Sequence, residues 1–216
     1  MSSSSWTGQL GEPTKLLLLR HGQTELSVGR RYSGRGDPEL TPLGHAQAAG
    51  AAQRLAARGV DLVLTSPLRR ARQTATAVAE AADVPLEERA GLIETDFGAW
   101  EGLTFTEARD LDPELHGRWL GAQDVAPPGG ESFVRVAQRV AAERAAVLDA
   151  YPGLTVVVVS HVTPIKMLIR DALLGGPEIL YRLHLDLASL SEAHFYPDGG
   201  ASVRLVNDTG HVPTEA

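Results

Sequence analysis

The 216-residue sequence contains no cysteine, so it can form neither disulfide bonds nor thiolate sites for zinc. The same absence excludes a cysteine nucleophile and every phosphatase mechanism that depends on one. Lysine is also scarce. Lys15 and Lys166 are the only two, so arginine supplies the other 18 of the 20 basic side chains. Arginine can hold a phosphate through two parallel hydrogen bonds, and this composition therefore suits a phosphate site.

Long apolar runs are absent as well, because no stretch approaches the ~20 residues that a membrane-spanning helix requires. The net charge of -7 argues against a general nucleic-acid or anionic-membrane surface, since both attract lysine and arginine. The first residues lack the basic and apolar regions of a signal peptide. We therefore expect a cytoplasmic protein without membrane contact or direct nucleic-acid binding.

Short apolar runs, by contrast, are present and end abruptly at polar residues. They are 16–19 followed by Arg20 and His21, 62–66 followed by Arg70 after a short turn, and 155–160 followed by His161. Runs of this length are typical of buried parallel strands. The carboxyl ends of such strands meet at one edge of the sheet, where ligands bind. Two histidines and several arginines at that edge indicate a phosphate site.

Strand-like runs alternate with helical patterns along the chain, which predicts an α/β fold with a mostly parallel sheet. The expected helices are 41–58, 67–82, 131–151 and 163–174. The expected further strands are 84–87, 91–94, 187–196 and 201–206, with an antiparallel hairpin formed by the last two. Residues 96–130, with helical turns at about 104–120, are the least regular part and a candidate lid.

These elements predict one domain at residues 15–210. Residues 1–14 are rich in serine, glycine and proline, so we expect a flexible leader or the remains of an interdomain linker. Residues 211–216 then form a C-terminal tail.

Hydrolysis of a phosphate ester without cysteine needs another nucleophile, cations for the phosphoryl oxygens and an acid for the leaving oxygen. His21 can attack phosphorus through a neutral imidazole nitrogen and form a phosphohistidine. Arg20 and Arg70 can hold the oxygens, and His161 supplies a further donor. Glu94 precedes a glycine-punctuated stretch and is the candidate proton donor.

Four ordered motifs resemble those of the histidine phosphatase superfamily, in its phosphoglycerate-mutase-like branch. They are Arg20-His21-Gly22-Gln23-Thr24, Ser66-Pro67-Leu68-Arg69-Arg70-Ala71-Arg72-Gln73-Thr74-Ala75, Leu92-Ile93-Glu94 with Gly98-Ala99-Trp100-Glu101-Gly102, and Ser160-His161. The resemblance implies a three-layer α/β/α sandwich and a reaction without metal or cofactor. It also implies that His21 is phosphorylated and that Glu94 donates the proton. The implied phosphate pocket consists of Arg20, Arg70 and His161.

Two longer stretches, 25–34 and 160–167, are similar to the C-terminal acid phosphatase domain of actinobacterial proteins that carry an N-terminal ribonuclease H domain. This likeness implies a fused ribonuclease H domain in the full-length protein, with residues 1–14 as the end of the linker. The phosphatase domain itself is expected to act on a small phosphorylated metabolite.

The resemblance also implies substrate contacts from residues beside the motifs, namely Gly22, Gln23, Thr24, Ser27, Arg31, Ser33, Gly34 and Val162. Two of these depart from the family pattern. Ser27 stands where many relatives have an asparagine, so its shorter hydroxyl reaches phosphate through water or the contact is lost. Val162 replaces a glycine, and we expect its bulk to narrow the pocket.

Other charged residues near the motifs have simpler explanations. Arg69 and Arg72 flank Arg70 on a predicted helix and face other directions, so we expect them in solvent. Arg31 and Arg35 belong to a loop that either lines the mouth of the site or carries only surface charge. Structural roles are expected for the histidines outside the motifs, which are His45, His116, His184, His194 and His211.

The sequence thus predicts a metal-independent phosphomonoesterase in which His21 attacks and Glu94 protonates the leaving oxygen and then activates water. The acid must carry a proton at the start, so we expect an acidic optimum. Two alternatives stay open, a phosphoglycerate mutase and a catalytically inactive module that binds phospholigands. The stretch 94–131 is short for a mutase lid, and the intact motifs argue against an inactive module.

The substrate is open among sugar phosphates, nucleotides, phosphoglycerates and ribazole phosphate. Its choice is expected to depend on residues 27–36 and 96–130, which lie beside the predicted phosphate pocket.

Overall fold

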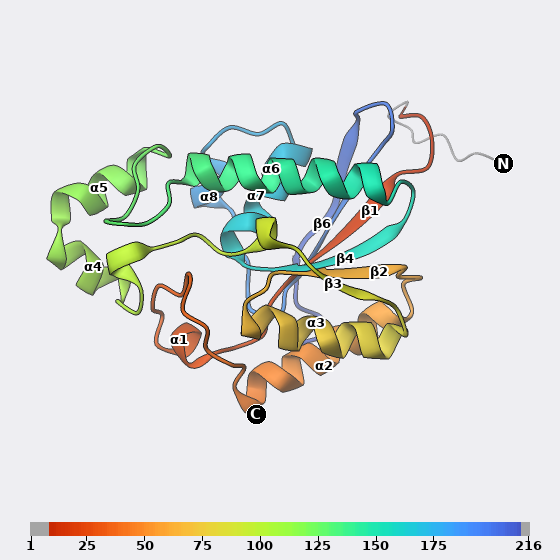
Figure 1. The fold of residues 1–216 in the computed structure, drawn as a ribbon, viewed down its shortest axis with the longest axis horizontal. Helices are drawn as coiled ribbons and strands as arrows, with labels where there is room; N and C mark the ends of the chain where they lie inside the picture. Colours follow the sequence, from red (N-terminus) through yellow and green to blue (C-terminus); the bar gives the residue numbers. More distant parts are fainter. Residues whose placement is uncertain (1–8, 213–216) are drawn as a thin grey trace.

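The computed structural model describes residues 9–212, which place a six-stranded sheet between two helical layers (Figure 1). The strands are β1 (Thr14–Arg20), β2 (Leu62–Thr65), β3 (Leu86–Glu88), β4 (Thr155–Ser160), β5 (Leu190–Phe195) and β6 (Ala201–Asp208). Their order across the sheet is β3-β2-β4-β1-β5-β6. Only β5 runs against the other strands of this sheet, being antiparallel to both β1 and β6. The expected mostly parallel sheet and the C-terminal antiparallel hairpin are confirmed.

The helices of the described chain cover both faces of this sheet. They are α1 (Glu25–Val28), α2 (Pro42–Ala56), α3 (Arg69–Ala82), α4 (Phe105–Leu111), α5 (Pro113–Gly121), α6 (Phe133–Ala150), α7 (Val162–Ala172) and α8 (Ile179–Arg182), with 3-10 turns η1 (Ala90–Leu92) and η2 (Gly98–Trp100). Helices α2 and α3 lie on one face, and α6, α7 and α8 lie on the other (Figure 1). The three-layer sandwich is therefore confirmed.

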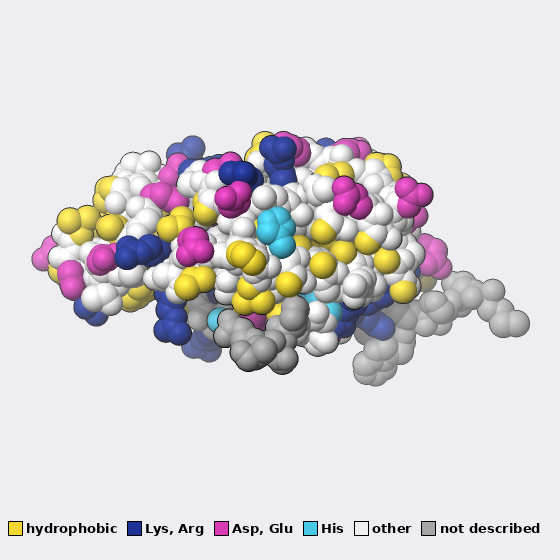
Figure 2. Space-filling model, turned by 90° about the horizontal axis from the view of Figure 1, so that it is seen from below, with side chains coloured by type: hydrophobic (Ala, Val, Ile, Leu, Met, Phe, Trp, Pro, Cys, Tyr) yellow, Lys and Arg dark blue, Asp and Glu magenta, His cyan; other side chains and the backbone are white. Residues whose placement is uncertain are grey.

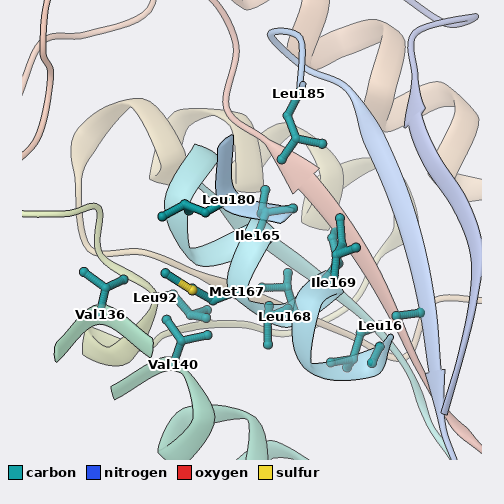
Figure 3. Close-up of a cluster of buried hydrophobic side chains, with 14 of the residues drawn as sticks. Leu16, Leu92, Val136, Val140, Ile165, Met167, Leu168, Ile169, Leu180 and Leu185 are labelled. Atoms are coloured by element: carbon teal, nitrogen blue, oxygen red, sulfur yellow. The ribbon is translucent and has the colours of Figure 1, made fainter. Parts of the chain in front are cut away.

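The leucines of β1 divide the core between the two faces of the sheet. Leu16 and Leu18 belong to the cluster under α6 and α7, whereas Leu17 and Leu19 belong to the cluster under α2 and α3. This division follows from the two-residue period of a strand, and burial on both faces explains the uninterrupted leucine run. Figure 3 shows the first cluster, with Leu16 beside α7. The two strands that lead into His21 and His161, β1 and β4, lie side by side in the middle of the sheet.

Local signals fix where the longer helices begin. The side chain of Thr41 accepts a hydrogen bond from the backbone N–H of Gly44, with Pro42 as the first residue of α2. Ser132 caps α6 in the same way by accepting from the N–H of Arg135. The predicted helical turns at 104–120 are confirmed as α4 and α5, and Thr104 forms a capping box at the start of α4.

The predicted strand at 91–94 is wrong. The chain forms the 3-10 turn η1 there, and the short third strand lies at Leu86–Glu88 rather than at 84–87. Carbonyls that a strand would pair with a neighbouring strand are bound instead by one side chain. The guanidinium of Arg139, on α6, donates to the carbonyl oxygens of Gly91, Ile93 and Glu94.

Residues 9–13, the last part of the predicted leader, lie against the β5–β6 hairpin. Gln9 Nε2 donates to the carbonyl oxygen of Ala201, and the N–H of Leu10 donates to Asp198. The remainder of the predicted leader, 1–8, and residues 213–216 of the predicted tail lie outside the described residues. The boundaries of the domain at 15 and 210 stay predictions.

The parallel pairing of β1 with β4 positions the site. Arg20 is the register partner of Ser160, so His21 and His161 leave the sheet at the same level. Thr65, at the end of β2, pairs with Val159 on the other side of β4. Polar residues from three strands therefore meet at one edge, as the sequence predicts.

Within residues 9–212, no helix has both the length and the apolar character needed to cross a membrane. On the face that carries α2 and α3, acidic, basic and hydrophobic side chains are interspersed (Figure 2). A surface of this kind is ordinary for a globular domain.

Gly44 provides a test of the packing between α2 and the loop after β1. A β-carbon at Gly44 would lie 2.2 Å from the carbonyl oxygen of Gln23. We expect Gly44→Ala to lower the free energy of unfolding by about 1–3 kcal/mol in urea titrations, despite the helix propensity of alanine. Gly117→Ala on α5, where a β-carbon meets open space, should instead raise it by up to about 1 kcal/mol. Equal stability of Gly44→Ala and wild type would contradict this account.

Candidate active site

His21 follows β1 directly, and its side chain is buried. Its Nδ1 lies 2.7 Å from the carbonyl oxygen of Gly22, so Nδ1 carries the ring proton and donates it. Nε2 therefore presents a lone pair, which accepts from Arg70 Nε at 3.3 Å. Burial, and then the charges of Arg70 and Arg20, lower the pKa of His21 well below 6.5. The imidazole is thus neutral and nucleophilic at neutral and mildly acidic pH.

Arg70, near the start of α3, is fully buried. Besides its bond to His21, its guanidinium donates to the carbonyl oxygens of Ser33, Gly34 and Gly36 at 2.8–3.0 Å. A buried cation needs such acceptors, because removing it from water without them costs several kcal/mol. The loop 33–36 therefore fixes the guanidinium beside the nucleophilic nitrogen.

Glu101 holds that loop from the other side. Its carboxylate accepts hydrogen bonds from the backbone N–H groups of Gly34, Arg35 and Gly36. The amides of the loop thus point at a carboxylate while its carbonyls point at Arg70. Glu101 is a positioning residue that sequence reasoning did not single out, although it lies within one of the quoted motifs.

His161 is fully buried beside His21, with 5.1 Å between the two ring centroids. Its Nε2 lies 2.7 Å from Ser66 Oγ. Ser66 Oγ also accepts from the N–H of Leu68 and has one proton of its own, which it can donate to His161 Nε2; the ring proton of His161 then lies on Nδ1. Burial is the main cause that lowers the pKa of His161 well below 6.5. This neutral ring is therefore a hydrogen-bond donor through Nδ1.

Three buried polar atoms near His21 have no hydrogen-bond partner among the described residues. They are Arg20 Nε, Ser33 Oγ and His161 Nδ1. Burial lowers the pKa of Arg20 to about 10, so it keeps its charge at neutral pH, and its Nη1 donates to the carbonyl oxygen of Leu185 at 2.7 Å. Unsatisfied buried donors are costly, and an anion beside His21 would satisfy them.

Glu94 is buried in the same cavity as His21. Its Oε1 accepts from the N–H of Thr95 at 2.8 Å, and its Oε2 lies 3.4 Å from the N–H of Thr163, in the first turn of α7. Arg139 binds the carbonyl oxygen of Glu94 and holds its backbone in place. No local sequence signal shows that Arg139 holds this segment, because the carbonyl oxygens that it binds lie 45 to 48 residues earlier in the chain.

The cavity has a volume of about 510 Å³. Of the predicted site residues, those that line it are Arg20, His21, Thr24, Ser27, Arg31, Ser33, Glu94 and Val162. Arg70 and His161 do not line it, but both contact His21. The structure thus brings together the five residues for which catalytic roles are predicted.

Gly22, Gln23 and Gly34, predicted as substrate contacts, do not line the cavity. A β-carbon on Gly22 would lie 2.5 Å from the carbonyl oxygen of Gly44, and one on Gly34 would lie 2.3 Å from that of Thr95. Both glycines are thus required where two backbone segments pass close to each other. Gln23 uses its Oε1 to accept from the Thr41 hydroxyl at 2.8 Å, and so supports the start of α2.

Ser27 and Val162, the two departures from the family pattern, both line the cavity. The Ser27 hydroxyl donates to the carbonyl oxygen of Thr24 at 2.7 Å and takes part in the capping box of α1. Its single proton is therefore already used within the loop. Val162 is the first residue of α7 and adds an apolar side chain to the lining of the cavity.

The flanking arginines differ in their positions. Arg31 lines the cavity, whereas Arg35 does not and pairs with Asp96 and Glu131. Arg69 and Arg72 are exposed, as predicted.

Of the histidines outside the motifs, His116 is buried, and its Nε2 lies 3.1 Å from Tyr32 Oη. His184 bonds to Asp186, His194 bonds to Glu192, and His211 bonds to the carbonyl oxygen of Ala188. His45 is exposed.

The chain matches the family model of the histidine phosphatase superfamily (branch 1) over residues 16–209, and it belongs to that superfamily. It is 58% identical over 212 residues to bifunctional protein Rv2228c of Mycobacterium tuberculosis, a match that covers 98% of this chain and 58% of that protein. It is 37% identical over 162 residues to phosphoserine phosphatase 1 of Hydrogenobacter thermophilus, covering 74% and 76% of the two chains.

The solved structure of Bacillus stearothermophilus YhfR resembles this fold with a TM-score of 0.86 at 30% identity, over 93% of this chain and 100% of that one. The chain thus spans a little over half the length of its mycobacterial relative and the whole of the YhfR structure. The resemblance stated from the motifs is confirmed, and phosphatases are among the relatives.

Glu101 offers a test of how the loop 33–36 supports the nucleophile. We expect Glu101→Gln to reduce kcat for p-nitrophenyl phosphate about tenfold, because one charge-assisted acceptor of the loop amides is lost. Glu39→Gln is the matched control, since Glu39 forms an exposed ion pair with Arg69, and its kcat should stay within about twofold of wild type. Equal effects of the two substitutions would contradict the positioning role.

The buried histidines predict how stability depends on pH. The pKa values of His21 and His161 are lowered in the folded state, whereas in the unfolded chain they return to about 6.5. The unfolded state then binds more protons below that pH. We expect the unfolding free energy to be highest above pH 6.5 and to fall by about 1 kcal/mol per pH unit per histidine as the solution is acidified.

Urea unfolding between pH 7.5 and 5 measures this slope, and a His21→Asn, His161→Asn double variant should show a shallower one. An unchanged slope in the double variant would mean that other groups cause the loss of stability.

Proposed function

We propose that this domain is a phosphomonoesterase, an acid phosphatase that works through a phosphohistidine at His21 without metal or cofactor. One observation carries the proposal. His21 and Glu94 line one cavity, where Arg20 and Ser33, and His161 behind His21, each have a buried polar atom without a partner among the described residues. These groups correspond to a nucleophile, a proton donor and an oxygen-binding pocket.

In the first step, His21 Nε2 attacks phosphorus, the N–P bond forms and the bond from phosphorus to the ester oxygen breaks. Glu94 gives its proton to that oxygen, so the alcohol leaves neutral. Arg20 and Arg70 bind the phosphoryl oxygens as cations, and His161 donates through Nδ1. These donors are already oriented by the protein, which lowers the cost of stabilising the charge in the transition state.

In the second step, the Glu94 carboxylate takes a proton from water, and the resulting hydroxide attacks the phosphohistidine. The N–P bond breaks, inorganic phosphate is released, and both His21 and Glu94 return to their starting protonation states. The balance is one water consumed and one alcohol and one phosphate produced.

The lowered pKa of His21 supports an acidic optimum. An ordinary imidazole would be protonated below pH 6.5 and would lose its nucleophilic lone pair, whereas this one stays neutral to lower pH. Acidification then favours the protonated general acid without inactivating the nucleophile.

The proposal also covers the full-length protein to which this domain belongs. The mycobacterial relative is called bifunctional and is longer than this chain, and this supports a further domain in the full-length protein, which we assign as the N-terminal ribonuclease H domain that the motif resemblance implies. We assign the phosphatase domain a small phosphorylated metabolite as substrate, a cytoplasmic location and no direct nucleic-acid binding.

Hydrolysis of p-nitrophenyl phosphate in EDTA across pH 4 to 8 tests the proposal. We expect activity that survives chelation, increases from pH 8 toward pH 5, and falls at least about 10³-fold in His21→Ala. His45→Ala, on the exposed side of α2, is the matched control and should retain wild-type activity. A ³²P-labelled substrate would label the phosphoenzyme in wild type but not in His21→Ala, and the label should be stable in alkali and labile in acid, as expected for a phosphohistidine.

Three results would overturn the proposal. Activity abolished by EDTA would show that a metal is required. Isomerisation of phosphoglycerate faster than phosphate release would favour the mutase, and absence of turnover with retained phosphate binding would favour an inactive binding module.

A further inference from the structure

The cavity that contains His21 and Glu94 has a charged floor and an aromatic wall. The chain has only three tryptophans, four tyrosines and four phenylalanines, yet six of these eleven line this cavity. They are Tyr32, Phe97, Phe105, Trp119, Phe133 and Tyr181. Leu120, Val162 and Leu180 complete the apolar lining. In a chain so poor in aromatic residues, this concentration marks a surface built for an apolar group.

The wall comes from segments outside the sheet. Phe105 begins α4, Trp119 and Leu120 end α5, and Tyr181 lies on α8. Helices α4 and α5 extend beyond the end of the sheet where the catalytic residues lie (Figure 1). They are therefore placed to contact the part of a substrate that points away from the phosphate.

The rings contact each other and form a continuous surface. The centroid distances are 4.8 Å for Tyr32 and Phe97, 5.1 Å for Trp119 and Phe133, and 6.3 Å for Phe133 and Tyr181. Rings at these distances stabilise one another and keep a fixed shape. The wall thus exists before any ligand binds.

The hydroxyls of the wall are already bonded within the protein, and Trp119 Nε1 is the one wall donor without a partner among the described residues. Tyr32 Oη lies 3.1 Å from His116 Nε2, and Tyr181 Oη donates to the carbonyl oxygen of Trp119 at 3.4 Å. Lys166 Nζ donates to the carbonyl oxygen of Leu180 at 2.8 Å.

Arg31 likewise donates to the carbonyl oxygen of Gly102 and to Glu107. A leaving group with many hydroxyls would lose its hydration here and gain few hydrogen bonds in return.

The chemistry fixes where the leaving group lies. Glu94 must reach the ester oxygen, so the carbon attached to that oxygen lies on the Glu94 side of the phosphate. Glu94, Phe97 and Phe133 line the same cavity, and the rest of the alcohol extends along the rings.

We propose that the substrate is a phosphomonoester of a bulky apolar alcohol that carries a ring, held by burial against this aromatic wall. The inference rests on the proposed phosphatase function for its chemistry, while the preference for an apolar group rests on the wall alone. Sugar phosphates, phosphoserine and phosphoglycerate are then poor substrates.

Binding of phosphonates tests the wall separately from catalysis, because the carbon–phosphorus bond is not hydrolysed. The probes are 2-phenylethylphosphonate and ethylphosphonate, and the readout is fluorescence of the tryptophans, of which Trp119 lines the cavity. We expect the phenyl compound to bind at least about tenfold more tightly, from the apolar area that it buries. Equal affinities would overturn the inference whether or not the protein is a phosphatase.

A matched pair of substitutions locates the effect. Leu120 lines the cavity and is 38% exposed, whereas Leu111, on neighbouring α4, is 65% exposed and does not line it. Leu120→Gln should reduce the preference for the phenyl compound at least about threefold, and Leu111→Gln should leave it unchanged. Phe105→Gln, at a position that is 46% exposed, provides a second wall variant should the first fold poorly. A preference that persists in both wall variants would contradict the assignment.

Turnover then distinguishes failure of the inference from failure of the proposed function. The substrates are 2-phenylethyl phosphate, ethyl phosphate, glycerol 3-phosphate, phosphoserine and adenosine 5′-monophosphate, with wild type and His21→Ala. Simple alkyl esters have leaving groups of similar basicity, so kcat/KM for the first two compares binding rather than intrinsic reactivity. Higher kcat/KM for 2-phenylethyl phosphate supports the inference.

Turnover that depends on His21 but favours glycerol 3-phosphate, phosphoserine or the nucleotide would overturn the inference and leave the phosphatase intact. Absence of turnover of every ester, with the phosphonate preference retained, would overturn the proposed function and leave the apolar site.

Discussion

The site depends on the burial of one guanidinium. Arg70 is fully buried, and its charge is tolerated because carbonyl oxygens of the loop 33–36 and His21 Nε2 surround it. That loop can offer its carbonyls because Glu101 binds its amides. His21, Arg70 and the loop 33–36 thus hold one another in place through hydrogen bonds. Glu101 completes this arrangement, although it lies about 80 residues after His21 in the sequence. Changes to any part of it alter the geometry at His21.

The two halves of the cavity have different structural origins. The charged floor comes from the ends of central parallel strands, where position is fixed by backbone pairing and by a core on both faces. The aromatic wall comes from helices and loops around the sheet, with Phe105 and Trp119 on α4 and α5, which extend beyond the end of the sheet. Rigid strands suit bond-breaking chemistry, which tolerates little displacement, whereas peripheral helices can vary without disturbing it. Family membership is therefore informative about the reaction and less so about the leaving group.

Sequence reasoning succeeded where a structure depends on residues close together in the chain, and failed where it depends on residues far apart. The leucines 16–19 and the valines 156–159 predict buried strands, because each strand is covered on both faces and needs no polar side. Thr41 with Pro42 predicts the start of α2 from local bonds alone. The strand predicted at 91–94 fails because its carbonyls are bound by Arg139, far along the chain. The close backbone approaches that require glycine at positions 22 and 34 are hidden from the sequence for the same reason, since the segments involved are distant along the chain.

By itself the sequence determined the α/β class, the superfamily and the five residues assigned to catalysis, because hydrophobic runs and short motifs encode strands and the residues at their ends. Tertiary structure decided which atoms face one another. It left Nε2 as the unprotonated nitrogen of His21, gave the proton of Ser27 to the carbonyl oxygen of Thr24, and gathered six aromatic side chains around one cavity. The physical reason is that the aromatic cluster depends on packing between segments separated by tens of residues. The bonds of His21 and Ser27 reach only one and three residues along the chain, but they depend on backbone angles that the packed fold sets.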